Sequence, residues 1–383
     1  MATRYTRRDL LRQALGASAG AALLPAGLAG CRGHGDAAAQ AAQAQPAPAK
    51  EALFYDRLAN RRVRCQLCPR KCEVGDRERG FCGVRENRGG TYHTLVYGQI
   101  AALNIDPIEK KPFFHYHPGS TAFSLGTAGC NFQCKDCQNW EVSQVRPEQV
   151  PNPTVLTPDE VAATAKRYNA PVIAFTYTEP VVFYEYVLDT ARAAAQQGIM
   201  SVMVSNGYIN PEPMRRLLHV LGAVKIDLKG ITDRFYRDYC AGTLQPVLDT
   251  IKLVHQSDAW LEVVYLVVPT VNDDDETIRH ACRWVRDNVG ASVPLHFSRF
   301  FPYYQLTNLP PTPVETLRRC YQIAGEAGLK YVYVGNIPDA DMLTTYCPNC
   351  HRTVVARRDF EVTANEIRGG KCRFCQATVP GVW

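Results

Sequence analysis

Short apolar runs alternate with longer amphipathic stretches between residues 121 and 336. The runs are rich in β-branched residues and have the length of buried strands, whereas the stretches between them repeat apolar residues at helical spacing. Prolines near the start of several stretches fit the first turn of a helix. The pattern predicts strands at 122–126, 172–177, 200–205, 224–228, 261–268, 295–300 and 331–334, and helices at 158–168, 183–197, 211–220, 246–255, 275–289 and 313–327.

Repeated strand–helix units of this kind predict an α/β fold with a parallel sheet. Six or seven units fit a partial or open TIM-like (β/α) barrel, which we place at 121–340. No G-x-G-x-x-G follows a predicted strand, so the pattern does not favour a dinucleotide-binding fold. Cysteine-rich segments flank the barrel on both sides, at 53–120 and 341–383.

Polar residues follow the predicted strands, where (β/α) barrels carry their reactive groups. For Ser205, Asn206 and Asn336 taken singly, a helix cap or turn explains the residue at least as well as a function does. Function is favoured for Glu179, which stands before Pro180 and after an apolar run. The residues read at these ends are Glu179, Ser205, Asn206, Asp227, Lys229, His296, Arg299 and Asn336.

The chain has 383 residues and is 46% hydrophobic, enough for one large core with appendages. Its formal net charge of +6 includes several arginines within the first twelve residues. The remainder is only mildly basic and has no dense run of lysine and arginine. We therefore predict no nucleic-acid partner.

The N-terminus has the pattern of an export signal. Thr6-Arg7-Arg8-Asp9-Leu10-Leu11-Arg12 is typical of a twin-arginine signal, and Leu28-Ala29-Gly30-Cys31 is typical of a lipobox. Residues 1–31 are thus predicted to be a signal and 32–52 a flexible tether rich in Ala, Gln and Pro. We expect export to the bacterial envelope, with membrane attachment only through a lipidated Cys31. The alternative is a cytoplasmic protein whose N-terminal arginines are incidental.

Most of the 15 cysteines lie in three tight groups, whose short spacing suits metal binding better than a disulfide framework. The central group, Cys130-Asn-Phe-Gln-Cys134-Lys-Asp-Cys137, directly follows the first predicted barrel strand. Three thiolates in such a loop can hold three corners of a cubic 4Fe–4S cluster. The fourth iron then has no protein ligand, which makes the cluster a reaction site.

The two flanking groups have four cysteines each. Cys347, Cys350, Cys372 and Cys375 form two C-x2-C pairs, the pattern of a zinc ribbon. We predict zinc there, with a rubredoxin-like single iron as the alternative. The group Cys65, Cys68, Cys72 and Cys82 fits either a second zinc site or an auxiliary iron–sulfur cluster, and spacing does not separate the two. The Cys-x2-Cys-Pro element at 65–69 resembles a zinc knuckle, which gives zinc the preference.

The cysteine loop and several other segments together resemble the radical S-adenosylmethionine (radical SAM) superfamily. Within it they are similar to the AmmeMemoRadiSam-system enzymes, which are relatives of pyruvate formate-lyase activating enzyme. The resemblance extends over residues 53–383. Besides the loop it rests on 106–112 (DPIEKKP), 126–130 (GTAGC), 138–140 (QNW), 175–180 (FTYTEP), 235–237 (FYR), 295–302 (LHFSRFFP) and 380–383 (PGVW).

This resemblance implies residue roles. Cys130, Cys134 and Cys137 would hold the 4Fe–4S cluster, and the methionyl group of S-adenosylmethionine would chelate its open iron. Glu179 matches the carboxylate that accepts a hydrogen bond from the methionyl amino group. The strand ends at Asn206, Asp227, Lys229 and His296 would contact the rest of this cofactor.

One position departs from the superfamily pattern. Asp136 precedes the third cysteine of the loop, where an aromatic ring often packs on the adenine. Either Phe132 takes over that role or Asp136 hydrogen-bonds the adenine amino group.

The resemblance also implies an activity. We expect an enzyme that reductively cleaves S-adenosylmethionine to a 5′-deoxyadenosyl radical, which abstracts hydrogen from a substrate. The substrate stays open: one candidate is a protein glycine, as in glycyl-radical activation, and a pathway with Memo-like and AMMECR-like partner proteins is an equal alternative. We expect ferredoxin or flavodoxin as the reductant. The alternative is a non-catalytic, exported iron–sulfur or zinc protein for electron transfer or as an adaptor, which needs no cytoplasmic cofactor.

Overall fold

A computed structural model describes residues 49–337 and 339–383, all within one compact unit. The predicted signal at 1–31 and most of the predicted tether at 32–52 lie outside the described residues. Within the described part of the chain, no helix is long and apolar enough to cross a membrane.

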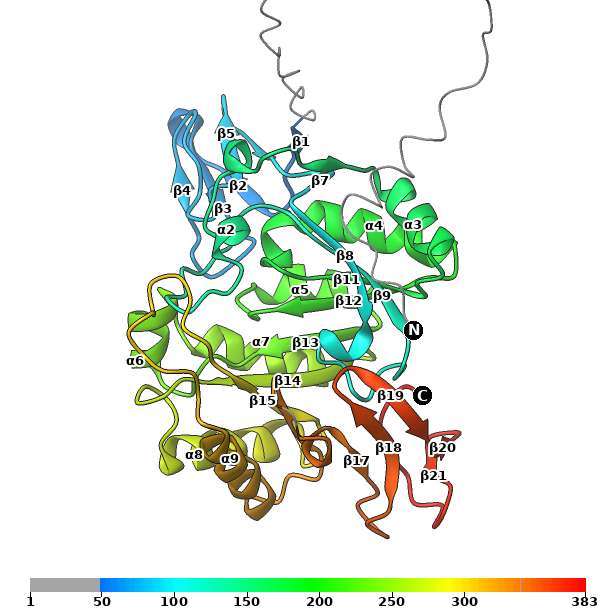
Figure 1. Ribbon diagram of the computed structural model, residues 1–383. Coiled ribbons are helices and arrows are strands. Elements are labelled where there is room, and N and C mark those ends of the chain that lie inside the picture. The colour runs from blue at the N-terminus through cyan, green and yellow to red at the C-terminus, as the bar shows by residue number, and fades with distance from the viewer. Residues whose placement is uncertain (1–48, 338) are drawn as a thin grey trace, which may run out of the picture. The chain divides into compact units, whose positions relative to one another are not determined.

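The predicted α/β fold with an open, mostly parallel sheet is confirmed (Figure 1). The eight strands follow the order β16-β15-β14-β13-β12-β11-β9-β8, and only β8 runs antiparallel to its neighbour. All four residues of β11 are buried, as expected for a strand covered on both faces. The strands are β8 (Ala102–Pro107), β9 (Thr121–Gly126), β11 (Val172–Phe175), β12 (Met200–Ser205), β13 (Ala223–Asp227), β14 (Trp260–Val267), β15 (Leu295–Arg299) and β16 (Val332–Gly335).

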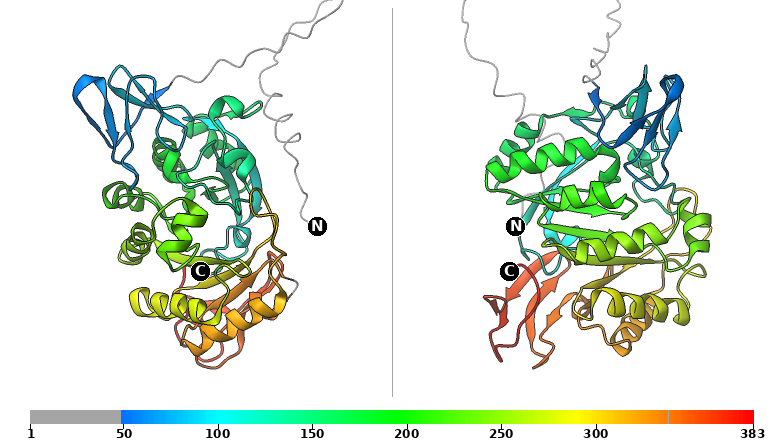
Figure 2. Two further views of the ribbon diagram at one scale, coloured as in Figure 1. Left: turned by 90° about the vertical axis from the view of Figure 1, so that its left-hand side faces the viewer. Right: turned by 180° about the vertical axis from the view of Figure 1, so that it is seen from behind.

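Six helices connect the parallel strands and lie along the outer face of the curved sheet (Figure 2). Their first turns follow the expected chemistry: α3, α5 and α7 have proline there. Thr157 and Asp274 cap α3 and α8 by accepting backbone N–H bonds. The helices are α3 (Pro158–Arg167), α4 (Tyr184–Gln196), α5 (Pro211–Leu218), α7 (Gln245–His255), α8 (Asp275–Val289) and α9 (Val314–Glu326).

β8 is the sheet strand that the hydrophobic pattern does not predict. It belongs to the segment 53–120, yet it pairs with β9 from Ala102↔Gly126 to Pro107↔Thr121. Most of its side chains are only partly buried, so it has no continuous apolar run. The N-terminal segment and the barrel therefore share one sheet, and the domain boundaries stay predictions.

Short strands build the N-terminal segment into two three-stranded sheets, β2-β3-β4 and β1-β6-β5, and β7 pairs with β10. A buried ion pair between Arg85 and Glu185 of α4 joins this segment to the barrel. The strands are β1 (Lys50–Glu51), β2 (Tyr55–Arg57), β3 (Val63–Cys65), β4 (Glu73–Val74), β5 (Arg85–Arg88), β6 (Thr91–Thr94), β7 (Gln99–Ile100) and β10 (Thr154–Val155).

The C-terminal strands pack near the amino end of β9. Arg357 is buried and its guanidinium donates to the carbonyl oxygen of Phe114 at 2.6 Å, while the rings of Trp383 and His115 lie 5.0 Å apart. The strands are β17 (Thr345–Tyr346), β18 (Thr353–Arg358), β19 (Glu361–Asn365), β20 (Ile367–Arg368) and β21 (Lys371–Cys372). The short helices of the chain are η1 (Ala59–Arg61), η2 (Ile108–Lys110), α2 (Trp140–Ser143), η3 (Pro147–Gln149), η4 (Pro180–Phe183), α6 (Asp233–Phe235), η5 (Tyr236–Cys240) and η6 (Asp341–Leu343).

Candidate functional site

The three-cysteine loop leaves the carboxyl end of β9 and is held by its neighbours on both sides. Gly129 has φ +90°, and a Cβ there would lie 2.5 Å from Val84 and 2.8 Å from the carbonyl oxygen of Cys82. On the other side, the amides of Gln133 and Lys135 donate to the carbonyl oxygens of η5 at 3.0 and 2.9 Å. The loop conformation is thus fixed by the fold.

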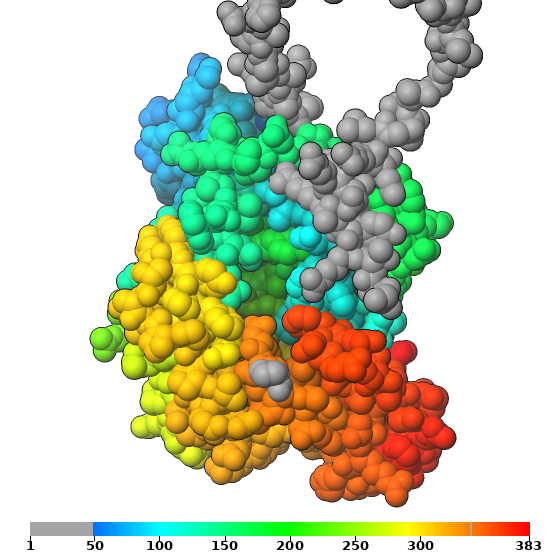
Figure 3. Space-filling view, in the orientation of Figure 1, coloured from blue at the N-terminus to red at the C-terminus, as the bar shows by residue number. Residues whose placement is uncertain are grey.

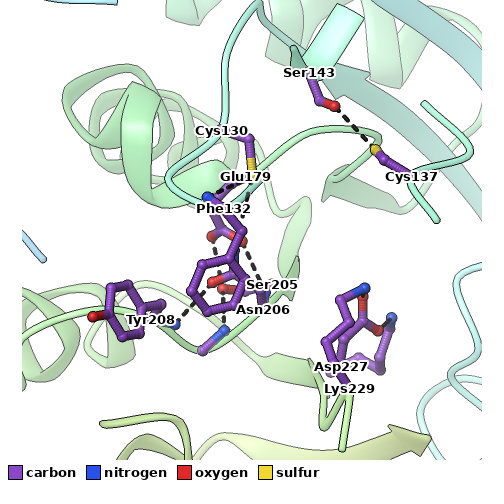
Figure 4. A network of polar contacts seen from close by, with 12 residues as sticks. Cys130, Phe132, Cys137, Ser143, Glu179, Ser205, Asn206, Tyr208, Asp227 and Lys229 are labelled. Carbon is purple, nitrogen blue, oxygen red and sulfur yellow. Dashed lines mark hydrogen bonds and ion pairs between the residues drawn. The ribbon is translucent and has the colours of Figure 1, made fainter. Parts of the chain in front are cut away.

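Each thiol of the loop has a nearby polar group. The backbone N–H of Phe132 donates to Cys130 Sγ at 3.3 Å, and Cys137 Sγ lies 3.1 Å from Ser143 Oγ (Figure 4). Burial raises the pKa of the Cys130 thiol, and Glu179 raises it further. A hydrogen bond with Cys240, followed by burial, raises the pKa of Cys134. Three thiols in one loop at the carboxyl end of β9 provide the ligand type and number that a cluster with one open iron needs.

Glu179 lies beneath Cys130 at the start of η4 (Figure 4). Its Oε1 accepts from Val181 N at 3.1 Å and from Ser205 Oγ at 2.7 Å, and its Oε2 accepts from Asn206 N at 2.8 Å. Burial raises the pKa of this carboxyl to about 7, although all three hydrogen bonds oppose the shift. The carboxylate is therefore fixed in direction and lacks a cationic partner among the groups that hydrogen-bond to it.

Asn206 links the Glu179 group to the cysteine loop. Its side-chain amide donates to Asn131 Oδ1 at 2.8 Å and lies 3.9 Å from Cys130 Sγ. Asn131 in turn donates to the carbonyl oxygen of Tyr208 at 2.7 Å. Asn131 was not predicted as a site residue, because nothing in the spacing of the cysteines shows where a side chain between them points.

Lys225, Asp227 and Lys229 form a row along β13 and its carboxyl end, in which Lys225 is buried and the other two are partly exposed. Lys229 Nζ donates to Asp227 Oδ2 at 3.0 Å, and Lys225 pairs with Asp227 Oδ1. Burial alone would raise the pKa of Asp227, but the two lysines outweigh it and hold this pKa below its ordinary value. Asp136 is also buried; burial raises its pKa, and the charge of Lys229 opposes the shift. Lys225 was missed because it lies within the strand and not at its end.

His296 is not where the sequence interpretation placed it. It is the second residue of β15 and lies near the amino end of that strand, whereas we read it at the carboxyl end. Its Nε2 lies 2.6 Å from Glu262 Oε2, and its ring packs edge-on against Phe114 at 4.9 Å. That prediction of position is wrong: the predicted strand 295–300 begins at the observed residue, and His296 was assigned to its carboxyl end although it is second in the run. Glu179 and Asn206 hydrogen-bond to each other, and Asp227 and Lys229 form the other pair (Figure 4).

The inner side of the sheet is reached from the face shown in Figure 3. The surface there is hollowed between the yellow segments and the orange and red ones, with green side chains at its floor.

The C-terminal cysteines form a compact group. The sulfur atoms of Cys347, Cys350, Cys372 and Cys375 all lie within 4.8 Å of one another. Cys347 and Cys375 are 3.5 Å apart, and Cys350 and Cys372 are 3.7 Å apart. The group is therefore a metal site in geometry and ligand type.

Comparison with known proteins identifies the domain around the cysteine loop. Residues 124–282 match the family model described as the radical SAM superfamily. The chain contains a radical SAM domain. This assignment places the cysteine loop, β9 and the strands through β14 within the radical SAM domain, and it implies a 4Fe–4S cluster and S-adenosylmethionine as cofactors.

One relative in sequence covers most of the chain, and a second covers less than half of it. An uncharacterised protein from Methanocaldococcus jannaschii is 45% identical over 328 residues, which are 85% of this chain and 97% of that protein. Pyruvate formate-lyase 1-activating enzyme from Escherichia coli is 25% identical over 167 residues, 40% of this chain and 68% of the enzyme. The similarity to activating enzymes is thus distant and partial.

Solved structures with related folds share little sequence with this chain. A domain of pyruvate-formate lyase-activating enzyme from Bacteroides vulgatus matches with a TM-score of 0.38 and 20% identity, over 43% of this chain and 98% of the domain. A radical SAM methyltransferase from Sphaerobacter thermophilus matches with a TM-score of 0.46 and 16% identity, over 57% of this chain and 67% of the enzyme.

Proposed function

We propose that this protein reductively cleaves S-adenosylmethionine and uses the resulting 5′-deoxyadenosyl radical to abstract hydrogen from a substrate. The observation that carries the proposal is the placement of Glu179, a buried carboxylate with fixed direction, beneath the thiol of Cys130. The radical SAM domain supports an enzyme. No observation on the described residues favours a non-catalytic carrier or adaptor.

The site residues fit both cofactors. Cys130, Cys134 and Cys137 would hold the cluster, which when bound supplies the electron for cleavage of the sulfonium. Glu179 would accept a hydrogen bond from the methionyl amino group, and Asn206 positions Glu179 through its backbone N–H. A cationic amino group beside Glu179 would lower the carboxyl pKa from about 7 and keep it ionised.

The row on β13 would bind the rest of S-adenosylmethionine. Lys229 is held by Asp227, so its ammonium group is fixed in position to meet a carboxylate or ribose hydroxyl. The other carboxylate oxygen of Asp227 pairs with Lys225, and the charges of the two lysines keep Asp227 ionised. These contacts orient the cofactor and keep its polar groups out of bulk water.

The structure favours Asp136 over Phe132 as the adenine contact. Phe132 is fully buried, and its ring centroid lies 4.8 Å from that of Tyr208. A Cβ on Gly242 would lie 2.3 Å from the same ring, so Phe132 is packed on more than one side. Asp136 would then accept a hydrogen bond from the adenine amino group.

The activity is tested by anaerobic reconstitution with iron and sulfide, followed by dithionite and S-adenosylmethionine. We expect 5′-deoxyadenosine and methionine, and no product from Cys134→Ala. Cys282→Ala is the matched control, since Cys282 is a buried cysteine that packs within α8. Absence of 5′-deoxyadenosine from protein with a full cluster would refute the proposal.

We infer a protein substrate of the glycyl-radical type. The supporting observation is the partial similarity to an enzyme named for activating pyruvate formate-lyase. The resemblance of the segments at 106–112 and 295–302 supports placement among AmmeMemoRadiSam-system enzymes, and we propose ferredoxin or flavodoxin as the reductant. Mass spectrometry of partner proteins after turnover tests this inference: an unchanged mass in every candidate protein would count against it.

Zinc is the ion that we propose for the C-terminal group. Tetrahedral coordination with Zn–S bonds of about 2.3 Å requires sulfur atoms about 3.8 Å apart. The 3.5 and 3.7 Å separations of its cysteine pairs are close to that value. Metal analysis of protein purified without added zinc separates this proposal from a single iron site.

Export and lipidation at Cys31 also remain proposals. Processing there would produce a shorter, membrane-attached chain. Fractionation of cells that contain the native protein tests this directly, and a full-length chain in the cytoplasm would refute it.

A further inference from the structure

Four thiols of the N-terminal segment gather in one place. The amide of Cys65 donates to the carbonyl oxygen of Cys72 at 2.9 Å, which brings β3 and the end of the first cysteine loop together. The thiol of Cys68 interacts electrostatically with those of Cys65, Cys72 and Cys82. Cysteines from a hairpin and from a later turn therefore share one buried region.

A backbone N–H is directed at each of these thiols. Phe81 N lies 3.5 Å from Cys72 Sγ. Cys65, Cys68 and Cys82 each accept a backbone hydrogen bond from the residue two positions further on, as Cys130 does in the radical SAM loop. Such N–H groups stabilise a metal-bound thiolate. The four thiols are thus arranged as ligands and not as packing residues.

The spacing of the four thiols differs from that of the C-terminal group. Among the described residues, Cys347, Cys350, Cys372 and Cys375 form the one group of thiols that lie within 4.8 Å of one another. Neither the N-terminal four nor the radical SAM three contains three thiols that all lie within this distance of one another. Thiolates at the corners of an iron–sulfur cube stand further apart than thiolates around one ion, so the wider spacing favours a cluster over zinc.

The N-terminal thiols adjoin the radical SAM loop. Arg70, between Cys68 and Cys72, donates to the carbonyl oxygen of Asn131 at 2.7 Å and also to that of Ala241. Gly129 is packed against the carbonyl oxygen of Cys82. Cys82 and Cys130 both line one cavity of about 750 Å³.

The geometry points to a second 4Fe–4S cluster, ligated by Cys65, Cys68, Cys72 and Cys82, that passes electrons to the cluster at Cys130. With four thiolates this cluster has no open iron, which suits electron transfer. One electron passes from a reduced donor of the iron–sulfur or flavin class to the second cluster and then to the first. Each transfer reoxidises the preceding centre and moves no proton. The relay role rests on the proposed function; the cluster itself does not.

Metal content tests the site independently of activity. Reconstituted wild-type protein should hold about eight irons and one zinc per chain. A variant with Cys130, Cys134 and Cys137 all changed to Ala should keep about four irons and their visible absorption. A variant with Cys68→Ser and Cys72→Ser should also keep about four irons, and Cys282→Ser is the control for loss of a buried thiol. Two zinc ions and no iron in the first variant would overturn the proposal.

Electron paramagnetic resonance tests the relay. Reduced wild-type protein should show spin–spin broadening between two clusters, and each variant should show one unbroadened signal. S-adenosylmethionine should alter only the signal that is lost in the Cys130/134/137 variant. Two clusters without mutual broadening would refute the relay. A second cluster in protein that fails to cleave S-adenosylmethionine would instead refute the proposed function and leave the site intact.

Discussion

The variant Glu179→Gln tests whether Glu179 acts in cofactor binding or only in stabilising the fold. In the proposed complex the carboxylate receives a charge-assisted hydrogen bond from the methionyl amino group. Glutamine keeps an oxygen for Val181 N and Ser205 Oγ but turns its amide NH2 toward Asn206 N, which now donates to Glu179 at 2.8 Å. The variant therefore loses the charge and leaves two donors facing each other.

The substitution should weaken cofactor binding and leave the free energy of unfolding nearly unchanged. Loss of one charge-assisted bond costs about 1.5–3 kcal/mol, which weakens S-adenosylmethionine binding about 10- to 150-fold. In the cofactor-free protein, the pKa shift from 4.5 to about 7 corresponds to about 3 kcal/mol of burial cost for the charged carboxylate. Glutamine removes that cost and forfeits about 1–3 kcal/mol at Asn206 N. We expect little net change in the free energy of unfolding.

Titration calorimetry with the cluster-loaded protein measures the affinity, and urea unfolding of the cofactor-free protein measures the stability. Ser205→Ala is the control, because it removes the hydrogen bonds that Ser205 Oγ donates to Glu179 and accepts from Gly207 N but keeps the charge of Glu179. Unchanged affinity in Glu179→Gln would refute the assigned role. A large loss of stability with no separate loss of affinity would make Glu179 a structural residue.

The Glu179 carboxyl group also predicts a pH dependence, because its pKa in the folded protein is about 7, above the ordinary 4.5. The cofactor-free protein should therefore lose stability as pH rises from about 4.5 through 7. Glu179→Gln should abolish this pH dependence of the free energy of unfolding, measured by urea unfolding. Gly129→Ala should prevent cluster assembly at the radical SAM loop, measured by iron content, because its Cβ would clash at 2.5 Å; full iron loading would refute this. Arg357→Met should lower the free energy of unfolding by about 3–5 kcal/mol, since it leaves Glu109 buried without its ion pair, and Arg358→Met is the exposed control. Chelation of the C-terminal metal should lower the melting temperature, and Cys372→Ser should abolish that response.

The sequence pattern predicts each parallel strand and each long helix to within two residues of its observed ends. Buried parallel strands are continuous runs such as Val172–Phe175, so they stand out from the polar turns. Strands of the flanking segments have two to six residues, too few for a periodic pattern to appear. β8 was missed for a related reason, because its partly exposed residues alternate with polar ones.

Site residues were predictable when they came within a few residues after a buried run. Glu179 and Asn206 do so, and the structure joins them by a hydrogen bond. His296 shows the limit, since it lies within its run, and its side chain points into a buried pair with Glu262. Asn131 was missed because its role depends on a contact with a residue 75 positions away. Such a contact is set by how the strands are arranged in the sheet, which local patterns do not show.

The two flanking cysteine groups lie at opposite ends of β9, and their positions argue for different roles. The N-terminal group touches the cluster loop through Arg70 and Cys82, next to the carboxyl end of β9. The C-terminal group belongs to the strands that bury Arg357 and Trp383 near its amino end. A metal beside the reaction site is placed to exchange electrons with it, whereas a metal in the C-terminal strands is placed to stabilise the fold. This asymmetry is why we assign iron–sulfur chemistry to one group and structural zinc to the other.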